Sequence, residues 1–368
     1  MPRKKLLKDV KRIVIKIGTS IITENGAISK ARVAELVSDI ISLKKSGYSV
    51  IIVSSGAISA GAGALSVSRE NASIPKKQAL AAIGQTILMN TWRESFLKEG
   101  CEVGQILLTE DDVKNRERFI NVRHTFNTLL EMGIVPVVNE NDSVVIKEIK
   151  FGDNDILSAH VTNIVEAGLL ILLSDIDGFY NDLSDPEPVE EIYAITKDVL
   201  SRAGSSGSIH GTGGMLSKLR AAQVIIRCGE RMIIANGRLK GILPRIVKGE
   251  KIGTIFFGTE QLCSRKRWIA FNMKSSGRIK IDDGAVKALS NNKKSLLSTG
   301  IIDIEGKFHL GDAVEIINTV GDVIGKGIVN YNFDELNIIK GKKTAQIKDI
   351  LGSSYFDEVI NRDDLILY

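Results

Sequence analysis

Residues 13–56 read IVIKIGTSIITENGAISKARVAELVSDIISLKKSGYSVIIVSSG, and this stretch decides the fold class. Two runs of mainly β-branched residues, at 13–17 and 50–53, enclose an amphipathic run at 31–45. Each apolar run is followed by a loop that contains glycine. A strand, a helix and a second strand in this order predict a parallel pair of strands with the helix packed on the sheet.

The same alternation continues to about residue 258, so we expect an α/β domain with a mainly parallel sheet and binding loops after the carboxyl ends of its strands. Further strands are expected at 105–108, 134–138 and 169–173, and further helices at 76–98, around 124–132 and at 156–166. Beyond residue 258, short segments separated by glycines predict a small β-rich domain. The predicted boundaries are a first domain at 1–258, a linker at 259–275 and a second domain at 276–360.

The composition is that of a globular protein, with 368 residues of which 43% are hydrophobic and 25% are charged. The longest strongly apolar run, residues 169–173, is far shorter than the roughly 20 residues that span a bilayer. The basic start leads directly into a strand pattern without a signal sequence, so a cytoplasmic location without a membrane span is expected. The net charge of +5 comes from scattered lysines, which favours a solvated surface over a nucleic-acid site.

The metal-binding residue types are sparse. Three cysteines and four histidines show no close ligand spacing, so no transition-metal site and no disulfide framework are predicted. Any metal is expected to be bound by oxygen, as Mg²⁺ is.

Two loops after predicted strands have the composition of anion sites. The first loop has a cation, Lys16, beside the flexible backbone of Gly18. The second is the run SSGAISAG at 54–61, which opens a helix whose first amide groups can point at an anion. Two alternatives stay open at this point. Lys16 could be an exposed edge residue, and the small residues could serve tight packing between helix and sheet.

Two acidic turns follow, NEND at 139–142 and GDND at 152–155. Their carboxylates and amides suit an ammonium group or a cation, although the same residues are common in turns and at helix N-caps.

The segment GTGGMLSK at 211–218 precedes a helix pattern and places Lys218 near a glycine-rich loop. Neither a Walker A spacing nor GxGxxG after the first strand is present. Phosphoryl transfer needs donors aimed at the moving phosphoryl group, bridging Mg²⁺ and an in-line acceptor, and two lysines, glycine amides and several aspartates supply such parts. These residues predict an ATP-dependent kinase for a small anionic metabolite.

In the order and approximate spacing of its motifs, the chain resembles the glutamate 5-kinase family within the amino acid kinase superfamily. The motifs are KIGTS at 16–20, SSGAI at 54–58, RERF at 116–119, NEND at 139–142, GDND at 152–155 and GTGGM at 211–215. This resemblance implies a three-layer sandwich and phosphorylation of the γ-carboxylate of L-glutamate by ATP and Mg²⁺, the first step of proline biosynthesis.

The resemblance also implies roles for individual residues. Lys16 and Lys218 would stabilise the transferring phosphoryl group, and Asp155 would orient the two lysines. Ser55, Asp142 and Asn154 would hold glutamate. The nucleotide would contact Lys16, Ser174, Asp175, Thr212, Gly213, Gly214, Met215, Leu216, Ser217 and Lys218. Ser174 and Ser217 stand where the family is expected to have threonine, so a hydroxyl is retained at both.

The tail is similar to a PUA domain, a small β-barrel, in segments such as IDDGA at 281–285 and SLLSTGI at 295–301. RNA binding by this tail is an analogy only. The family further implies proline as a feedback inhibitor, a homo-oligomer and a separate glutamyl phosphate reductase as a possible partner. Two alternatives remain, a related kinase with another small acceptor and an RNA-binding regulatory protein that acts through the tail.

Overall fold

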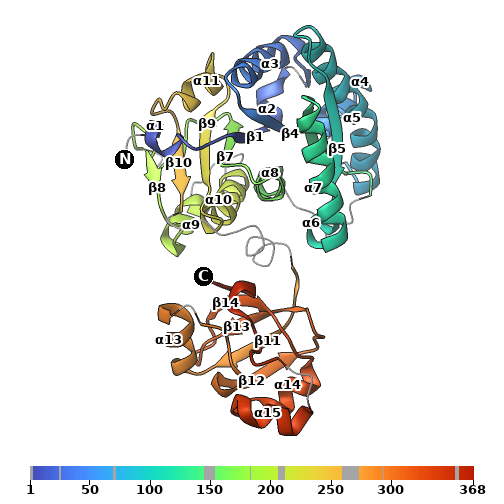
Figure 1. Ribbon diagram of the computed structural model, residues 1–368. Helices are drawn as coiled ribbons and strands as arrows, with labels where there is room; N and C mark the ends of the chain where they lie inside the picture. Colours follow the sequence, from blue (N-terminus) through green and yellow to red (C-terminus); the bar gives the residue numbers. More distant parts are fainter. Residues whose placement is uncertain are drawn as a thin grey trace. The chain divides into compact units, whose positions relative to one another are not determined.

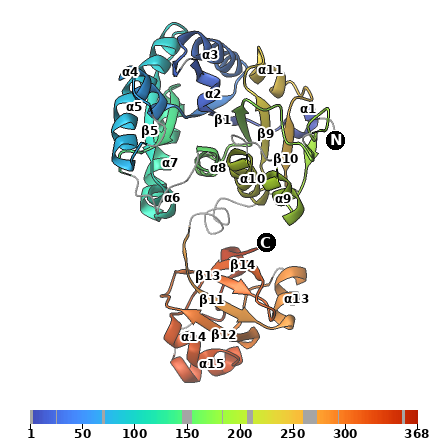
Figure 2. The ribbon, with the colours of Figure 1, turned by 180° about the vertical axis from the view of Figure 1, so that it is seen from behind.

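The computed structural model describes residues 3–24, 26–68, 72–144, 154–182, 184–205, 212–258, 273–292, 294–352 and 356–368. The chain forms two compact units (Figures 1 and 2), one of Met1–Val113 with Glu117–Gln261 and one of Lys114–Arg116 with Leu262–Tyr368. Most of the predicted linker lies outside the described residues, so the boundaries at 258 and 276 stay a prediction. Each unit is described by itself below.

The first unit is built on an eight-stranded sheet in the order β5-β6-β4-β1-β7-β9-β10-β8. Only the β9–β10 pair is antiparallel, so the predicted mainly parallel sheet is confirmed. Its strands are β1 (Arg12–Ile17), β4 (Ser49–Ser54), β5 (Val103–Leu108), β6 (Val135–Glu140), β7 (Leu169–Ser174), β8 (Glu191–Ile192), β9 (Arg231–Asn236) and β10 (Thr254–Phe257). A separate hairpin pairs β2 (Thr23–Glu24) with β3 (Ala27–Ile28).

Helices cover both faces of this sheet, which gives the expected three layers (Figure 1). One face packs on α3 (Lys30–Lys45), α5 (Ile74–Leu97) and α11 (Ile242–Val247), and the opposite face packs on α8 (Asn154–Ile164) and α10 (Thr212–Arg227). The remaining helices of the unit are α1 (Arg3–Leu6), α2 (Thr19–Ile22), α4 (Ala57–Ala64), α6 (Glu110–Lys114), α7 (Arg116–Glu131) and α9 (Lys197–Ser205), of which α6 and α7 each have one terminal residue, Lys114 or Arg116, in the second unit.

The alternation of side chains along β1 determines which face receives Lys16. Ile13, Ile15 and Ile17 join the hydrophobic core that contains Leu36 of α3 and residues of α5 and α11. Successive side chains of a strand point to opposite faces, so Lys16 points to the face covered by α8 and α10. Lys16 therefore points at α8 and α10 and not into the hydrophobic core that contains Leu36.

Helices α4 and α5 approach each other through glycines. A Cβ added to Gly84 of α5 would lie 1.8 Å from the carbonyl oxygen of Ala57, and one added to Gly61 of α4 would lie 2.0 Å from that of Leu80. No side chain larger than hydrogen fits at either position. The small residues after β4 thus serve tight packing between two helices, rather than the packing between helix and sheet that the sequence suggested, and this packing fixes the helix that begins after Gly56.

The second unit is a five-stranded sheet in the order β12-β11-β13-β14-β15, which confirms the predicted small β-rich domain. Its strands are β11 (Ser275–Ile281), β12 (Ile301–Gly306), β13 (Ala313–Ile317), β14 (Val323–Ile328) and β15 (Leu365–Leu367), and its helices are α13 (Asp283–Asn292), α14 (Phe333–Ile339) and α15 (Thr344–Leu351). Ile279, Ile316 and Tyr331 are fully buried in its core. In the described parts of both units, every helix is too short or too polar to cross a bilayer.

The glycine contact between α4 and α5 yields a stability prediction. Gly84→Ala forces the two helices apart, because its new methyl group meets backbone rather than a movable side chain. We expect a loss of about 3 kcal/mol in the free energy of unfolding of the first unit, measured by urea titration. Gly168→Ala is the matched control, since its nearest atoms would lie 3.5 Å from the added Cβ. Equal stability of the two variants would contradict the proposed packing.

Candidate active site

Four adjacent strands of the first unit bring the predicted polar residues to one edge of the sheet. The strands β6, β4, β1 and β7 are neighbours and parallel, so their carboxyl ends lie side by side. Asn139, Ser54, Lys16 and Ser174 lie at or near these ends, and Ser55 follows β4 directly. The carboxyl ends of these strands therefore bring together residues that are as much as 158 positions apart in the sequence, as Lys16 and Ser174 are.

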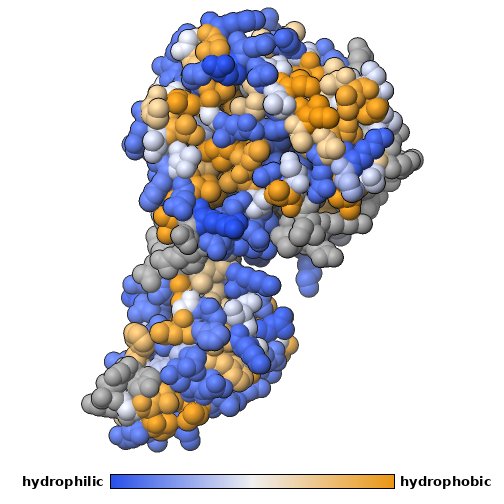
Figure 3. Space-filling view, turned by 90° about the vertical axis from the view of Figure 1, so that its right-hand side faces the viewer, coloured by the Kyte–Doolittle hydropathy of each residue, from blue (hydrophilic) through white to orange (hydrophobic). Residues whose placement is uncertain are grey.

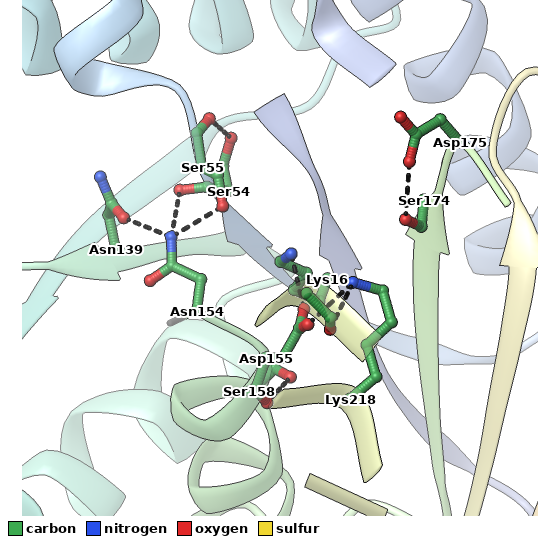
Figure 4. Close-up of polar contacts among 11 residues, drawn as sticks. Lys16, Ser54, Ser55, Asn139, Asn154, Asp155, Ser158, Ser174, Asp175 and Lys218 are labelled. Carbon is green, nitrogen blue, oxygen red and sulfur yellow. Dashed lines mark hydrogen bonds and ion pairs between the residues drawn. The ribbon is translucent and has the colours of Figure 1, made fainter. Parts of the chain in front are cut away.

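At the centre of this edge, Asp155 of α8 is held between two lysines (Figure 4). Its Oδ1 lies 2.6 Å from the Nζ of Lys16, and its Oδ2 lies 3.1 Å from the Nζ of Lys218. Asp155 has no exposed surface, and both lysines are buried as well. The alternative that Lys16 is an exposed edge residue is wrong, because β1 is a central strand.

The charge of Asp155 is maintained by the lysines. Burial by itself disfavours the carboxylate, but the opposing positive charges of Lys16 and Lys218 and their hydrogen bonds hold the pKa of Asp155 below its ordinary value. These three groups, one carboxylate and two ammonium groups, together carry one net positive charge. This charge suits a ligand with phosphate or carboxylate oxygens.

Beside this charged group lies a cluster of amides and hydroxyls (Figure 4). The Nδ2 of Asn154 donates to Ser55 Oγ at 2.9 Å and to Asn139 Oδ1 at 2.9 Å, with the carbonyl oxygen of Ser54 at 3.4 Å. The Oγ of Ser54 accepts a hydrogen bond from the indole nitrogen of Trp92 at 3.0 Å. Asn154 and Asp155 are consecutive residues of α8, so one helix turn joins this cluster to the lysines.

The loop after β4 depends on one glycine. Gly56 precedes α4 with φ +112° and ψ −1°, a left-handed conformation that other residues rarely adopt. The turn brings the chain from β4 into the helix directly after Ser55. The backbone N–H of Ser55 also donates to the carbonyl oxygen of Ile17 at 3.1 Å, which ties this loop to β1.

The predicted nucleotide residues lie in two places. Ser174 ends β7 and its Oγ donates to the Oδ1 of Asp175 at 3.1 Å, and no dashed line in Figure 4 joins these two residues to the lysines. The segment 212–218 forms the first turns of α10, and within it the Nζ of Lys218 also donates to the carbonyl oxygen of Gly214 at 3.3 Å. The side chain of Thr212 and all of Gly211 lie outside the described residues. The nucleotide contacts of Ser174, Asp175, Thr212, Gly213, Gly214, Met215, Leu216, Ser217 and Lys218 stay a prediction.

The expectation that residues 211–218 precede a helix is wrong for most of the segment. Helix α10 begins at Thr212, so Lys218 lies in its second turn rather than in a loop. The sequence indicated a loop because glycine destabilises the interior of a helix through its loss of backbone conformational entropy. Near the start of a helix, the hydrogen bonds of the following turns offset this entropy loss. The side chain of Lys218 reaches Asp155 from the helix.

Asp142 lies half-buried in the turn after β6, and its role stays a prediction. Two other polar residues belong to the cluster, of which Asn139 was predicted only as part of the NEND turn and Gln85 was not predicted. Asn139 is 3% exposed and is a residue of β6 rather than of the following loop. Gln85 of α5 accepts a hydrogen bond from Asn139 Nδ2 at 2.8 Å. A single glutamine in a helical pattern gives no signal in the sequence, whereas Asn139 belonged to a motif that was already of interest.

Comparison with known proteins identifies both units. Residues 11–236 match the amino acid kinase family, and residues 277–351 match the PUA domain. A carbamate kinase from Giardia has the same fold as the first unit, with a TM-score of 0.50 and 17% identity over 68% of this chain and 100% of that chain.

Curated relatives match over nearly the whole length. Glutamate 5-kinases from Syntrophotalea carbinolica and Geobacter sulfurreducens are each 46% identical to this chain and cover 99% of it, and the alignments cover 99% and 100% of those proteins. The glutamate 5-kinase of Caldanaerobacter subterraneus subsp. tengcongensis is 44% identical over 97% of both chains.

The position of Asp155 yields a prediction for stability and its pH dependence. Asp155→Asn removes the negative charge that lies at contact distance from two buried ammonium groups, so we expect the free energy of unfolding at pH 7 to fall by about 3 kcal/mol in urea titrations. The pKa of Asp155 is lower in the folded state than its ordinary 3.8. The stabilisation is therefore present above pH 4 and is lost as the pH falls through the folded-state pKa, where wild type and variant should converge.

Asp175→Asn is the control for this measurement, because Asp175 is exposed. We expect its free energy of unfolding to stay within about 0.5 kcal/mol of the wild type. A stable Asp155→Asn variant at pH 7 would show that the lysines do not depend on this carboxylate.

Proposed function

Because this chain belongs to the amino acid kinase family and, within it, to the glutamate 5-kinases, we propose that it phosphorylates the γ-carboxylate of L-glutamate with ATP. The product is L-glutamyl 5-phosphate, and the reaction is the first step of proline biosynthesis from glutamate. The observation that carries this proposal is the placement of two consecutive residues at the start of α8. Asn154 contacts the cluster of amides and hydroxyls, and Asp155 contacts two buried lysines.

The transfer requires no general base. The glutamate γ-carboxylate is ionised at neutral pH, so one of its oxygens can attack the γ-phosphorus of ATP directly. A new bond forms between this oxygen and phosphorus, and the bond between phosphorus and the oxygen of ADP breaks. Asp155 keeps its negative charge throughout, because its lowered pKa leaves it ionised at neutral pH.

The two lysines stabilise the phosphoryl group during transfer. Negative charge accumulates on its oxygens, and ammonium groups that are already positioned stabilise this charge without reorganisation. Asp155 holds one lysine with each of its carboxylate oxygens. Asp155 thus fixes the positions of the ammonium groups of Lys16 and Lys218 before the nucleotide binds.

The acceptor binds on the side of Ser55 and Asn154, and the nucleotide binds on the side of Ser174, Asp175 and the start of α10. Asp142 is proposed to receive the substrate ammonium together with Asn154. Backbone N–H groups at the start of α10 suit the phosphates of ATP, because the helix dipole favours negative charge there.

Mg²⁺ is proposed to accompany ATP. In the described part of the chain, no group of three His, Cys, Asp or Glu residues could hold a metal ion. Mg²⁺ typically keeps several waters and binds one or two carboxylates plus substrate phosphates, and the exposed carboxylate of Asp175 fits such a role. Bound Mg²⁺ would neutralise charge on the phosphate oxygens.

Several further properties of the family are proposed for this chain. We propose a cytoplasmic enzyme that is inhibited by proline, self-associates and passes its short-lived acyl phosphate to a separate glutamyl phosphate reductase. Hydrophobic patches on the side of the first unit that carries α4 and α5 support self-association (Figure 3), and Leu65, Ile74, Ile83 and Leu97 are exposed there. RNA binding by the PUA domain stays a prediction.

The proposed activity is tested with ATP, Mg²⁺, L-glutamate and hydroxylamine. We expect γ-glutamyl hydroxamate, because hydroxylamine captures the acyl phosphate. L-aspartate, which is shorter by one methylene, serves as the comparison substrate. Turnover of aspartate or another acid without turnover of glutamate would contradict the substrate assignment.

Lys218→Ala tests the role of the lysines. We expect kcat to fall by about 10² or more in the same assay, as for other lost donors to a transition state. Lys45→Ala is the matched control, since Lys45 is exposed at the end of α3, and its kcat should equal that of the wild type. A Lys218→Ala enzyme with the wild-type kcat would remove this lysine from the mechanism.

A further inference from the structure

Gln85 of α5 contacts the candidate site from a helix to which no functional residue has been assigned. Its Oε1 accepts a hydrogen bond from Asn139 Nδ2, and Asn139 in turn contacts Asn154. We propose that Gln85 is a positioning residue, which holds the two asparagine amides in the orientation that receives the ammonium group of the acceptor. The inference rests on the proposed function, because the ammonium group is that of an α-amino acid.

The orientation of Asn139 is set by a backbone group and completed by Gln85. The backbone N–H of Glu140 can only donate, and it donates to Asn139 Oδ1 at 2.9 Å. The amide nitrogen of Asn139 must therefore point the other way, where it meets Gln85 Oε1 at 2.8 Å. Because Asn139 is 3% exposed, this nitrogen has little access to water and depends on Gln85 as an acceptor.

The orientation of Asn154 follows from that of Asn139. Asn154 Nδ2 faces Asn139 Oδ1 and the carbonyl oxygen of Ser54, both of which can only accept. Its own Oδ1 is consequently turned away from them. This oxygen is buried and has no hydrogen-bond partner among the described residues. A buried acceptor without a partner suits a ligand donor, and the ammonium group is the only donor of an ionised glutamate.

Gln85 acts on the ammonium through these two amides. Without this acceptor, the buried nitrogen of Asn139 has no partner. Rotation of the amide does not supply one, because Nδ2 would then face two donors, Asn154 Nδ2 and the backbone N–H of Glu140, so the amide is no longer held firmly in its orientation. Asn154 then loses the partner that fixes its Oδ1. Among the described residues, Gln85 makes no hydrogen bond to the Lys16–Asp155–Lys218 group, so its loss should weaken acceptor binding and leave phosphoryl transfer unchanged.

The test compares Gln85→Met, which has a similar length and lacks the amide acceptor, with Gln85→Glu, which keeps an acceptor oxygen. For Gln85→Met we expect an increase of about tenfold in the KM for glutamate, with kcat and the KM for ATP unchanged. Gln85→Glu should stay within about threefold of the wild type in all three constants. Gln85→Ala is a second variant without an acceptor, and thermal melting establishes that each variant is folded.

Glutarate provides a probe that separates this role from a general structural one. It has both carboxylates of glutamate but no ammonium group, so its inhibition constant against glutamate should be the same for wild type and Gln85→Met. An inhibition constant that rises with the KM for glutamate would overturn the proposal, and so would Met and Glu variants that lose kcat together. A wild-type enzyme that makes no γ-glutamyl hydroxamate would instead overturn the proposed function.

Discussion

The buried contact of one carboxylate with two ammonium groups determines how the first unit must be built. Removing three charges from water is costly, and the cost is offset only if the partners are held at contact distance. Lys16 comes from a central strand, Asp155 from the start of α8 and Lys218 from the second turn of α10. The sheet and both helices therefore have to meet at this edge for the three charges to be compensated.

The start of α8 connects this charged group to the polar cluster. Adjacent residues of a helix point in directions about 100° apart, so Asn154 and Asp155 can face different neighbours without any bend in the chain. Asn154 contacts the end of β4 and β6, while Asp155 contacts β1 and α10. For a transfer reaction this arrangement is useful, because the acceptor and the moving group are positioned relative to the same rigid element.

Much of the fold could be predicted from the sequence because apolar runs and amphipathic runs alternate so regularly. The strand expected at 169–173 is present as β7, which is buried along its whole length. Short elements gave no comparable pattern. Strand β8 has two residues and β10 has four, too few for an alternation of apolar and polar side chains to be recognised. The helices of the second unit were not predicted, because the frequent glycines in this part of the sequence indicated short β segments.

The candidate site was predictable in its motifs and not in its contacts. Lys16 and Lys218 were singled out because each stands near glycines in sequence, a local property. Their common partner Asp155 is joined to them only by the fold, and its role came from the resemblance to a family. Gln85 could not be found in this way, because its contact with Asn139 depends on the close approach of α5 to the sheet.

The packing of α5 against α4 links stability to function in this chain. Gly61 and Gly84 allow α4 and α5 to touch through their backbones, and Gln85 is the next residue after Gly84. A side chain in place of either glycine would move α5 by a fraction of an ångström or more. A hydrogen bond of 2.8 Å from Asn139 to Gln85 tolerates little such movement. Gly61 and Gly84 thus affect the amide cluster without contacting it. Their packing fixes the position of α5, and with it the distance between Gln85 and Asn139.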